Sequence, residues 1–197
     1  MGRIRVVSIV GPTAAGKSMI AMELARRFKG EIISADSMQV YRYMDIGTAK
    51  PSLKDRAEIP HHLIDVVLPD EDYNAARFRQ DALKAAELID GRGNRVIIAG
   101  GTGLYLRAFL SGIFEGPGKD SILRERLEKE AVIHGRRYLH ERLSEVDPVS
   151  AKRIHPNHIS RIMRALEVYY STGRPISEFQ SEHGFTENRF ETLKIGI

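Results

Sequence analysis

The chain has 197 residues, with 30 Lys and Arg against 26 Asp and Glu, and it contains no cysteine. The lack of cysteine excludes disulfide scaffolds, thiolate zinc sites and cysteine nucleophiles. A hydrophobic content of 42% with 28% charged residues is that of a globular chain and excludes wholesale disorder. No apolar run reaches the roughly 18 residues of a membrane span, and residues 1–10 are too short for a signal peptide. We therefore expect a soluble, cytoplasmic, monomeric protein with no membrane partner.

The first half of the chain alternates strand and helix patterns. Residues 4–10 are a β-branched apolar run that ends at Gly11, which is typical of a buried strand in a parallel sheet. Residues 18–28 have helical spacing and residues 31–36 form a short strand, which together complete a βαβ unit. The sequence further predicts a weaker strand at 62–68, a helix at 73–89, a strand at 95–99 and a helix at 104–110.

Strand patterns stop at the turn cluster of residues 116–118 and return only at the end of the chain. Helices are expected at 120–134, 136–145 and 147–154, followed by one that Asn157 opens and Gly173 ends. Residues 192–197 alternate like a strand. We predict an α/β protein with a P-loop NTPase-like parallel sheet core (1–113), a helical insertion (114–187) and a returning core strand (188–197). The remainder of the core would then be missing from this chain.

A phosphate-binding motif of the form G-x-x-x-x-G-K-[ST] lies between the first strand and the first helix. It consists of Gly11, Pro12, Thr13, Ala14, Ala15, Gly16, Lys17 and Ser18. Its backbone N–H groups and the helix N-terminus favour phosphate oxygens, Lys17 can reach the terminal phosphate, and Ser18 can ligate Mg²⁺. We expect a diphosphate or polyphosphate ligand and a Mg²⁺ cofactor; a simple glycine turn is the alternative.

The acid that accompanies this motif follows the strand after the first helix. An ATPase would usually carry a magnesium-binding Asp after a later strand, but residues 95–99 lead into Gly-Gly-Thr instead. Because parallel strands present their carboxyl ends to one crevice, we expect Asp36 to share a cleft with Lys17 and to accept a proton from a nucleophile. Thr102 could offer its hydroxyl to the same cleft. A turn-capping Asp and a tight strand-to-helix turn are the respective alternatives.

Positive charge is concentrated in one acid-free stretch between Pro148 and Leu166. The basic residues there are Lys152, Arg153, His155, His158, Arg161 and Arg164. Such a stretch is a candidate for phosphate contacts, and a solvated helix face is the alternative.

These motifs, in their order, resemble the bacterial tRNA dimethylallyltransferase family. The segments that carry the resemblance are GPTAAGKS, ADSMQVYR, DIGTAKP, PHHLID, GGTGLYLRA and RALEVYYSTGRP. The resemblance implies transfer of a dimethylallyl group from dimethylallyl diphosphate to N6 of the adenosine beside the anticodon of tRNA (position 37), with release of pyrophosphate. It also implies a P-loop core whose helical insertion grips the anticodon stem-loop.

The resemblance further implies roles for single residues. The 11–18 loop would bind the diphosphate, with Mg²⁺ on Ser18, and Asp36, Thr102 and Lys17 would be catalytic. The implied tRNA contacts are Asp36, Ser37, Met38, Gln39, Thr102, Arg124, Ser160, Arg161, Ile162, Met163 and Arg164. His158 and Ser160 depart from the acid and Gln usual in the family. The family also continues past Ile197 into a segment with another arginine, so we expect this chain to catalyse poorly.

Other functions remain open on the sequence alone. Within the resemblance, the acceptor could be a free adenine nucleotide. Outside it, the motif would also suit a small-molecule P-loop kinase with Asp36 as the acceptor base, or a nucleotide switch.

Overall fold

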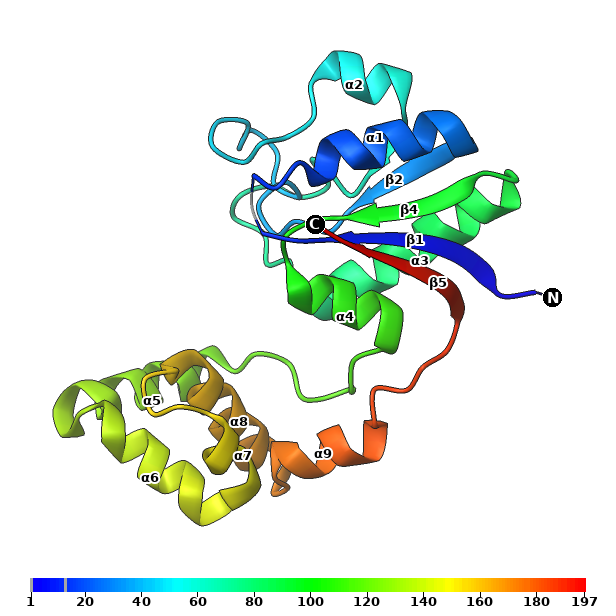
Figure 1. Ribbon diagram of the computed structural model, residues 1–197. Coiled ribbons are helices and arrows are strands. Elements are labelled where there is room, and N and C mark those ends of the chain that lie inside the picture. The colour runs from blue at the N-terminus through cyan, green and yellow to red at the C-terminus, as the bar shows by residue number, and fades with distance from the viewer. Residues whose placement is uncertain (1, 13) are drawn as a thin grey trace. The chain divides into compact units, whose positions relative to one another are not determined.

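The computed structural model describes residues 2–12 and 14–197. The chain divides into two compact units (Figure 1). The core unit comprises Met1–Ile113 and Thr186–Ile197, and the helical unit comprises Phe114–Phe185. Each unit has its own hydrophobic core.

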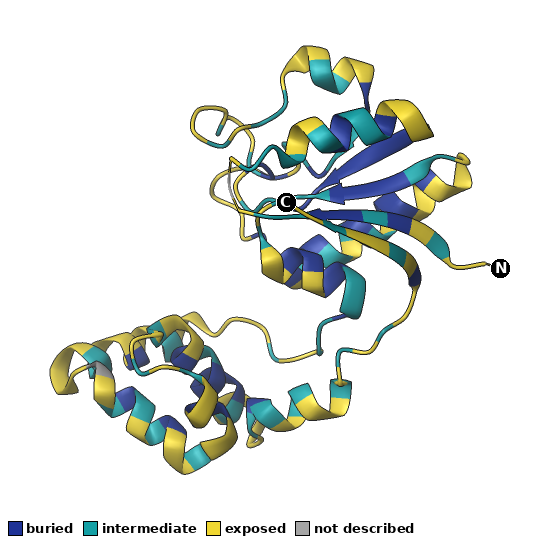
Figure 2. Cartoon of the chain, in the orientation of Figure 1, coloured by how far each residue is buried: buried dark blue, intermediate teal, exposed yellow. Residues whose placement is uncertain are grey.

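A five-stranded sheet in the order β3-β2-β4-β1-β5 forms the centre of the core unit, and all its paired strands are parallel. The strands are β1 (Ile4–Val10), β2 (Gly30–Ser34), β3 (His61–His62), β4 (Arg95–Ala99) and β5 (Phe190–Gly196). The central strands are mostly buried, as Figure 2 shows, because helices cover both faces of the sheet. Because the strands are parallel, their carboxyl ends lie at the same edge of the sheet, where the loops that follow them can form a site.

Alternating side chains of the strands divide the core between the two faces. Ile9 and Ile97 pack with α1 (Lys17–Phe28) on one face. Val6 and Ile98 pack on the other with α3 (Ala75–Gly91) and α4 (Gly103–Ser111). Across that second face, Phe78 of α3 stacks on Tyr105 of α4 with ring centroids 4.2 Å apart. The short helix α2 (Leu53–Glu58) begins at a capping box formed by Ser52 and Asp55.

The helical unit surrounds a core of fully buried leucine and isoleucine side chains. Its helices are α5 (Ser121–His134), α6 (Arg136–Val146), α7 (Pro148–Arg153), α8 (Ile159–Thr172) and α9 (Ile176–His183). The core includes Leu127, Leu139, Leu143, Ile162 and Leu166. No helix among the described residues is long and apolar enough to cross a membrane.

One buried carboxylate joins the start of α5 to α8. Glu167 has no exposed surface and accepts hydrogen bonds from the Asp120 amide (2.8 Å), from Nε and Nη2 of Arg124 (2.8 and 2.9 Å) and from Nη1 of Arg164 (2.6 Å). Burial alone would raise the pKa of Glu167, but the hydrogen bonds from the two arginines outweigh it and lower the pKa to about 2.

The predicted α/β fold with a parallel sheet is confirmed, and most predicted elements appear within a few residues of their expected bounds. The predicted strand at 62–68 is wrong beyond His62, because Leu63 and Asp65 have φ angles of 64° and 56°, which a strand cannot contain. The helix expected to open at Asn157 begins at Ile159, with His158 at its N-cap. The helices α2 and α9 are not among the predicted elements.

We expect Glu167→Gln to destabilise the helical unit by roughly 3 kcal/mol at pH 7, because two arginines would lose a buried counter-charge. The folded-state pKa lies below the unfolded one, so the stabilisation by Glu167 is complete above pH about 4.5 and declines as the pH falls towards 2. Urea unfolding at pH 7 and pH 3 would measure this, with exposed Glu128→Gln as the control. A loss of equal size at both pH values would contradict the assignment.

Candidate functional site

The phosphate-binding motif lies between the end of β1 and the start of α1. Ala14 and Gly16 have φ angles of 66° and 83°, so the loop curls through left-handed backbone before the helix begins. Nζ of Lys17 donates to the carbonyls of Gly11 (2.9 Å) and Pro12 (2.5 Å), which places the ammonium within the loop. Thr13, which was predicted as part of the motif, lies outside the described residues. The curled backbone, the helix N-terminus and the ammonium together suit a phosphate group.

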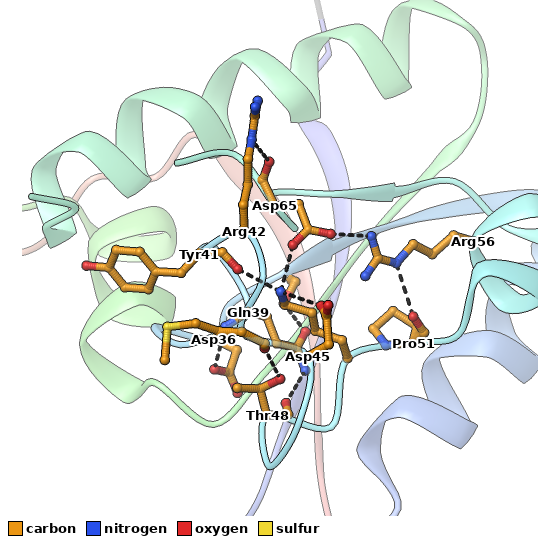
Figure 3. Close-up of polar contacts among 12 residues, drawn as sticks. Asp36, Gln39, Tyr41, Arg42, Asp45, Thr48, Pro51, Arg56 and Asp65 are labelled. Carbon is orange, nitrogen blue, oxygen red and sulfur yellow. Dashed lines mark hydrogen bonds and ion pairs between the residues drawn. The ribbon is translucent and has the colours of Figure 1, made fainter. Parts of the chain in front are cut away.

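Asp36 follows β2 and closes a tight turn. Its Oδ1 accepts hydrogen bonds from the amides of Met38 (2.8 Å) and Gln39 (3.3 Å) (Figure 3). In the described part of the chain its Oδ2 accepts no hydrogen bond, and the residue is half-buried. The turn thus uses one carboxylate oxygen for structure and leaves the other for a substrate. The sequence left turn capping and proton acceptance as alternatives for Asp36. The structure allows both, because each role uses a different carboxylate oxygen.

Thr102 lies directly against this turn. Its Oγ1 accepts from the amide of Ser37 (3.0 Å) and donates to the Ser37 hydroxyl (3.2 Å), while its own amide donates to the carbonyl of Ala35 (3.1 Å). The structure therefore brings the Asp36 turn and Thr102 together from the ends of β2 and β4.

Gly100 permits this approach. A Cβ atom on Gly100 would lie 2.1 Å from the carbonyl oxygen of Ala35, so no side chain fits there. The sequence shows a glycine pair at this point, but only the fold reveals that one of the two glycines faces a neighbouring backbone.

A pocket of about 410 Å³ lies beside α1 within the core unit, and its lining does not include Lys17, Asp36 or Thr102. Its lining combines apolar side chains, such as Met22 and Ile32, with the polar or charged side chains of Ser18, Arg26, Ser34, Gln39, Lys50, Asp55 and His61. The apolar side chains come from α1 and the sheet. Ser18 and Gln39 connect this pocket to the phosphate-binding loop and to the segment after Asp36, so the pocket adjoins the candidate site.

Gln39 is held inside the protein. Its Oε1 accepts from the hydroxyl of Ser34 (2.8 Å). Its Nε2 donates to the carbonyls of Thr48 and Ala49 (both 3.0 Å), on the segment that Figure 3 shows. Both amide hydrogens are used, so the side chain orders the segment that contains the Asp36 turn. Sequence reasoning predicted Gln39 as a direct tRNA contact and missed these partners. Ser37 is half-buried, and Met38 is the most exposed of the three residues after Asp36.

The tRNA contacts predicted in the helical unit fall into three groups. Ser160 and Arg161 are exposed at the start of α8. Arg124 and Arg164 are half-buried and paired with Glu167. Ile162 and Met163 are buried in the core of the unit, so the expectation that their side chains contact RNA does not fit the structure. A helix turns successive side chains to different faces, and five consecutive residues cannot share one surface.

The described residues contain no cluster of three or more His, Asp or Glu side chains that could hold a metal ion. Among the described residues of the phosphate-binding loop, the side-chain oxygen donor is the hydroxyl of Ser18. Mg²⁺ characteristically takes one or two protein ligands together with phosphate oxygens and water, so this donor set fits a metal brought in with a diphosphate.

The parallel sheet, the loop at the N-terminus of α1 and the carboxylate after β2 define an α/β protein of the P-loop class. The family model described as IPP transferase matches residues 39–197. The chain belongs to the IPP transferase family.

Two curated relatives illustrate the likeness. Over 195 residues, the chain is 53% identical to tRNA dimethylallyltransferase 2 of Geotalea uraniireducens (strain Rf4) and 49% identical to tRNA dimethylallyltransferase of Geobacter sulfurreducens (strain ATCC 51573 / DSM 12127 / PCA). Each match covers 99% of this chain and 63% of the relative. The chain thus spans less than two thirds of the length of these relatives.

Solved structures agree with this assignment. A eukaryotic dimethylallyltransferase acting on tRNA matches with a TM-score of 0.80 and 34% identity, over 98% of this chain and 48% of that one. The tRNA delta(2)-isopentenylpyrophosphate transferase of Staphylococcus epidermidis matches with a TM-score of 0.59 and 42% identity, over 98% of this chain and 63% of that one.

We expect Gly100→Ala to destabilise the core unit by about 1–3 kcal/mol, because the new methyl group would meet the carbonyl of Ala35. Urea unfolding would measure the loss. Gly103→Ala is the matched control, since a Cβ at Gly103 meets nothing within 4 Å and α4 begins there. Equal stability of the two variants would contradict the close approach.

Proposed function

We propose that this chain transfers a dimethylallyl group from dimethylallyl diphosphate to N6 of the adenosine beside the anticodon of tRNA and releases pyrophosphate. The observation that carries the proposal is the contact between the Asp36 turn and Thr102 at the edge of the sheet where the P-loop also lies. Membership of the IPP transferase family and relatives named tRNA dimethylallyltransferase support it. Because loop, turn and threonine come from one chain, we propose a monomer that acts on tRNA in the cytoplasm.

The P-loop and Lys17 would bind the diphosphate and stabilise the negative charge that develops on it as the allylic C–O bond breaks. Mg²⁺, held by Ser18 and the diphosphate oxygens, would supply further positive charge. The N6 nitrogen would form the new C–N bond and pass its proton to Oδ2 of Asp36, the oxygen that the turn does not use. Thr102, whose hydroxyl is bonded to Ser37 beside Asp36, would contact the reaction centre.

The helical unit would bind the anticodon stem-loop. Ser160 and Arg161 are exposed at the start of α8, within the acid-free stretch. Exposed basic side chains bind RNA phosphates and position the substrate, while a base splayed out of the loop can enter an active-site pocket.

Asp36→Asn should lower the rate of prenyl transfer by about 10²–10⁴-fold, because the amide cannot accept the N6 proton. Its Oδ1 can still accept from Met38 and Gln39, so the turn and the affinity for dimethylallyl diphosphate should persist. Mass spectrometry of a stem-loop RNA incubated with the donor and Mg²⁺ would give the rate, with exposed Asp90→Asn as the control. Undiminished transfer by the Asp36 variant would refute this role.

Arg161→Ala should weaken stem-loop binding and reduce the slope of log affinity against log salt by about 1, because one phosphate contact is lost. Arg137→Ala on α6 removes another exposed arginine and is the control. Filter binding across a salt series would measure the affinity and the salt slope of both variants. In a parallel transfer assay, AMP in place of the stem-loop would test a free nucleotide as acceptor. An unchanged salt slope would remove Arg161 from the interface.

A further inference from the structure

The segment from Asp36 to Pro51 has almost no regular secondary structure. Its one strand-like feature among the described residues is an isolated bridge between Tyr41 and Val67. Tyr43 and Ala49 have φ angles of 65° and 50°, which are unfavourable for residues with a side chain. Backbone hydrogen bonds join residues 39–42 to residues 65–67, and side-chain contacts act together with them to hold this segment, and with it the Asp36 turn, in one conformation.

Lys50 makes three of these side-chain contacts. Its ammonium donates to the carbonyl of Tyr41 (2.6 Å) and to the carboxylates of Asp45 (3.0 Å) and Asp65 (2.6 Å). An ammonium has three hydrogens, and each has an acceptor here. The Lys50 side chain is only 3% exposed. The ammonium thus joins the end of the Asp36 turn, the middle of the segment and the chain after β3.

A second cation completes the cluster. Arg56 donates through Nη1 to the other oxygen of Asp65 (2.6 Å) and through Nε to the carbonyl of Pro51 (3.1 Å), as Figure 3 shows. Burial lowers the pKa of Lys50, but the hydrogen bonds to Asp65 and Asp45 outweigh it and raise the pKa above its usual value. The cluster thus pairs the carboxylates of Asp45 and Asp65 with the cations of Lys50 and Arg56.

The residues beside Lys50 lead back to the carboxylate of Asp36. The carbonyls of Thr48 and Ala49 hold the amide group of Gln39, and the Gln39 backbone N–H donates to Oδ1 of Asp36. The Lys50 ammonium and the backbone beside it thus hold the turn on both sides, through Tyr41 and through Gln39.

We propose that Lys50 is a positioning residue: its buried ammonium fixes residues 36–41 so that the free oxygen of Asp36 stays aligned with the acceptor. The inference rests on the proposed transferase function. Lys50 lies outside the phosphate-binding motif, so its loss should impair the alignment of the acceptor and leave the binding of the donor intact.

The test compares four variants of the whole chain. Lys50→Met removes all three donors, and Lys50→Arg keeps the charge beside Asp45 and Asp65 but cannot place a planar guanidinium on three acceptors grouped around one nitrogen. Lys54→Met and Lys54→Arg make the same changes at an exposed lysine of α2. Hydrogen–deuterium exchange of a peptide spanning 36–42 reports the order of the turn without any need for activity.

We expect exchange in this peptide to rise by about tenfold or more in Lys50→Met, to rise less in Lys50→Arg, and to stay unchanged in both Lys54 variants. Transfer by Lys50→Met should show kcat lower by about a hundredfold, with KM for dimethylallyl diphosphate within about threefold of the original. If Lys50→Met fails to fold, Lys50→Arg decides the question by the same two measurements.

Unchanged exchange in folded Lys50 variants would overturn the proposal. So would faster exchange with an unchanged kcat, because the turn would then be loosened without consequence. If the original chain transfers no prenyl group at all, the proposed function fails, and the exchange measurement still decides whether Lys50 holds the turn.

Discussion

Backbone atoms of Ala35 and Gly100 come so close that a Cβ atom on the glycine would lie 2.1 Å from the alanine carbonyl oxygen. This approach joins the ends of β2 and β4, and the amide of Thr102 donates to the same carbonyl. The hydroxyl of Thr102 then meets Ser37, the residue after Asp36. Because the strands are parallel, the phosphate-binding loop at the end of β1 lies at the same edge. The candidate site depends on this one close backbone contact.

Buried charge orders irregular chain in both units, with opposite signs. In the core unit an ammonium, Lys50, is surrounded by a carbonyl and two carboxylates. In the helical unit a carboxylate, Glu167, is surrounded by two guanidinium groups and an amide. A buried charge is tolerated only when its partners satisfy it, so each cluster specifies where its neighbouring segments lie. Arg124 and Arg164, which the sequence marked as RNA contacts, have this structural task.

The candidate site could be predicted from the sequence wherever the signal is local. The phosphate-binding motif has fixed spacing and stands between a strand and a helix, so its place was predicted from local pattern alone. Asp36 was assigned to the same edge because it follows a parallel strand. The partners of Gln39 could not be predicted, since Thr48 and Ala49 follow a loop whose path no periodicity describes. The strand expected after His62 was wrong because Leu63 turns into left-handed backbone.

The sequence by itself determined the class of the fold, the order of most elements and the residue types available for phosphate binding and proton transfer. These follow from hydrophobic periodicity and from local motifs, which act over a few residues. Only the tertiary structure decided which polar groups are available to a ligand. Arg124 and Arg164 are paired with Glu167, and Gln39 is committed to internal carbonyls. The physical reason is that burial and hydrogen-bond partners depend on segments far apart in the chain, which meet only when the strands and helices pack.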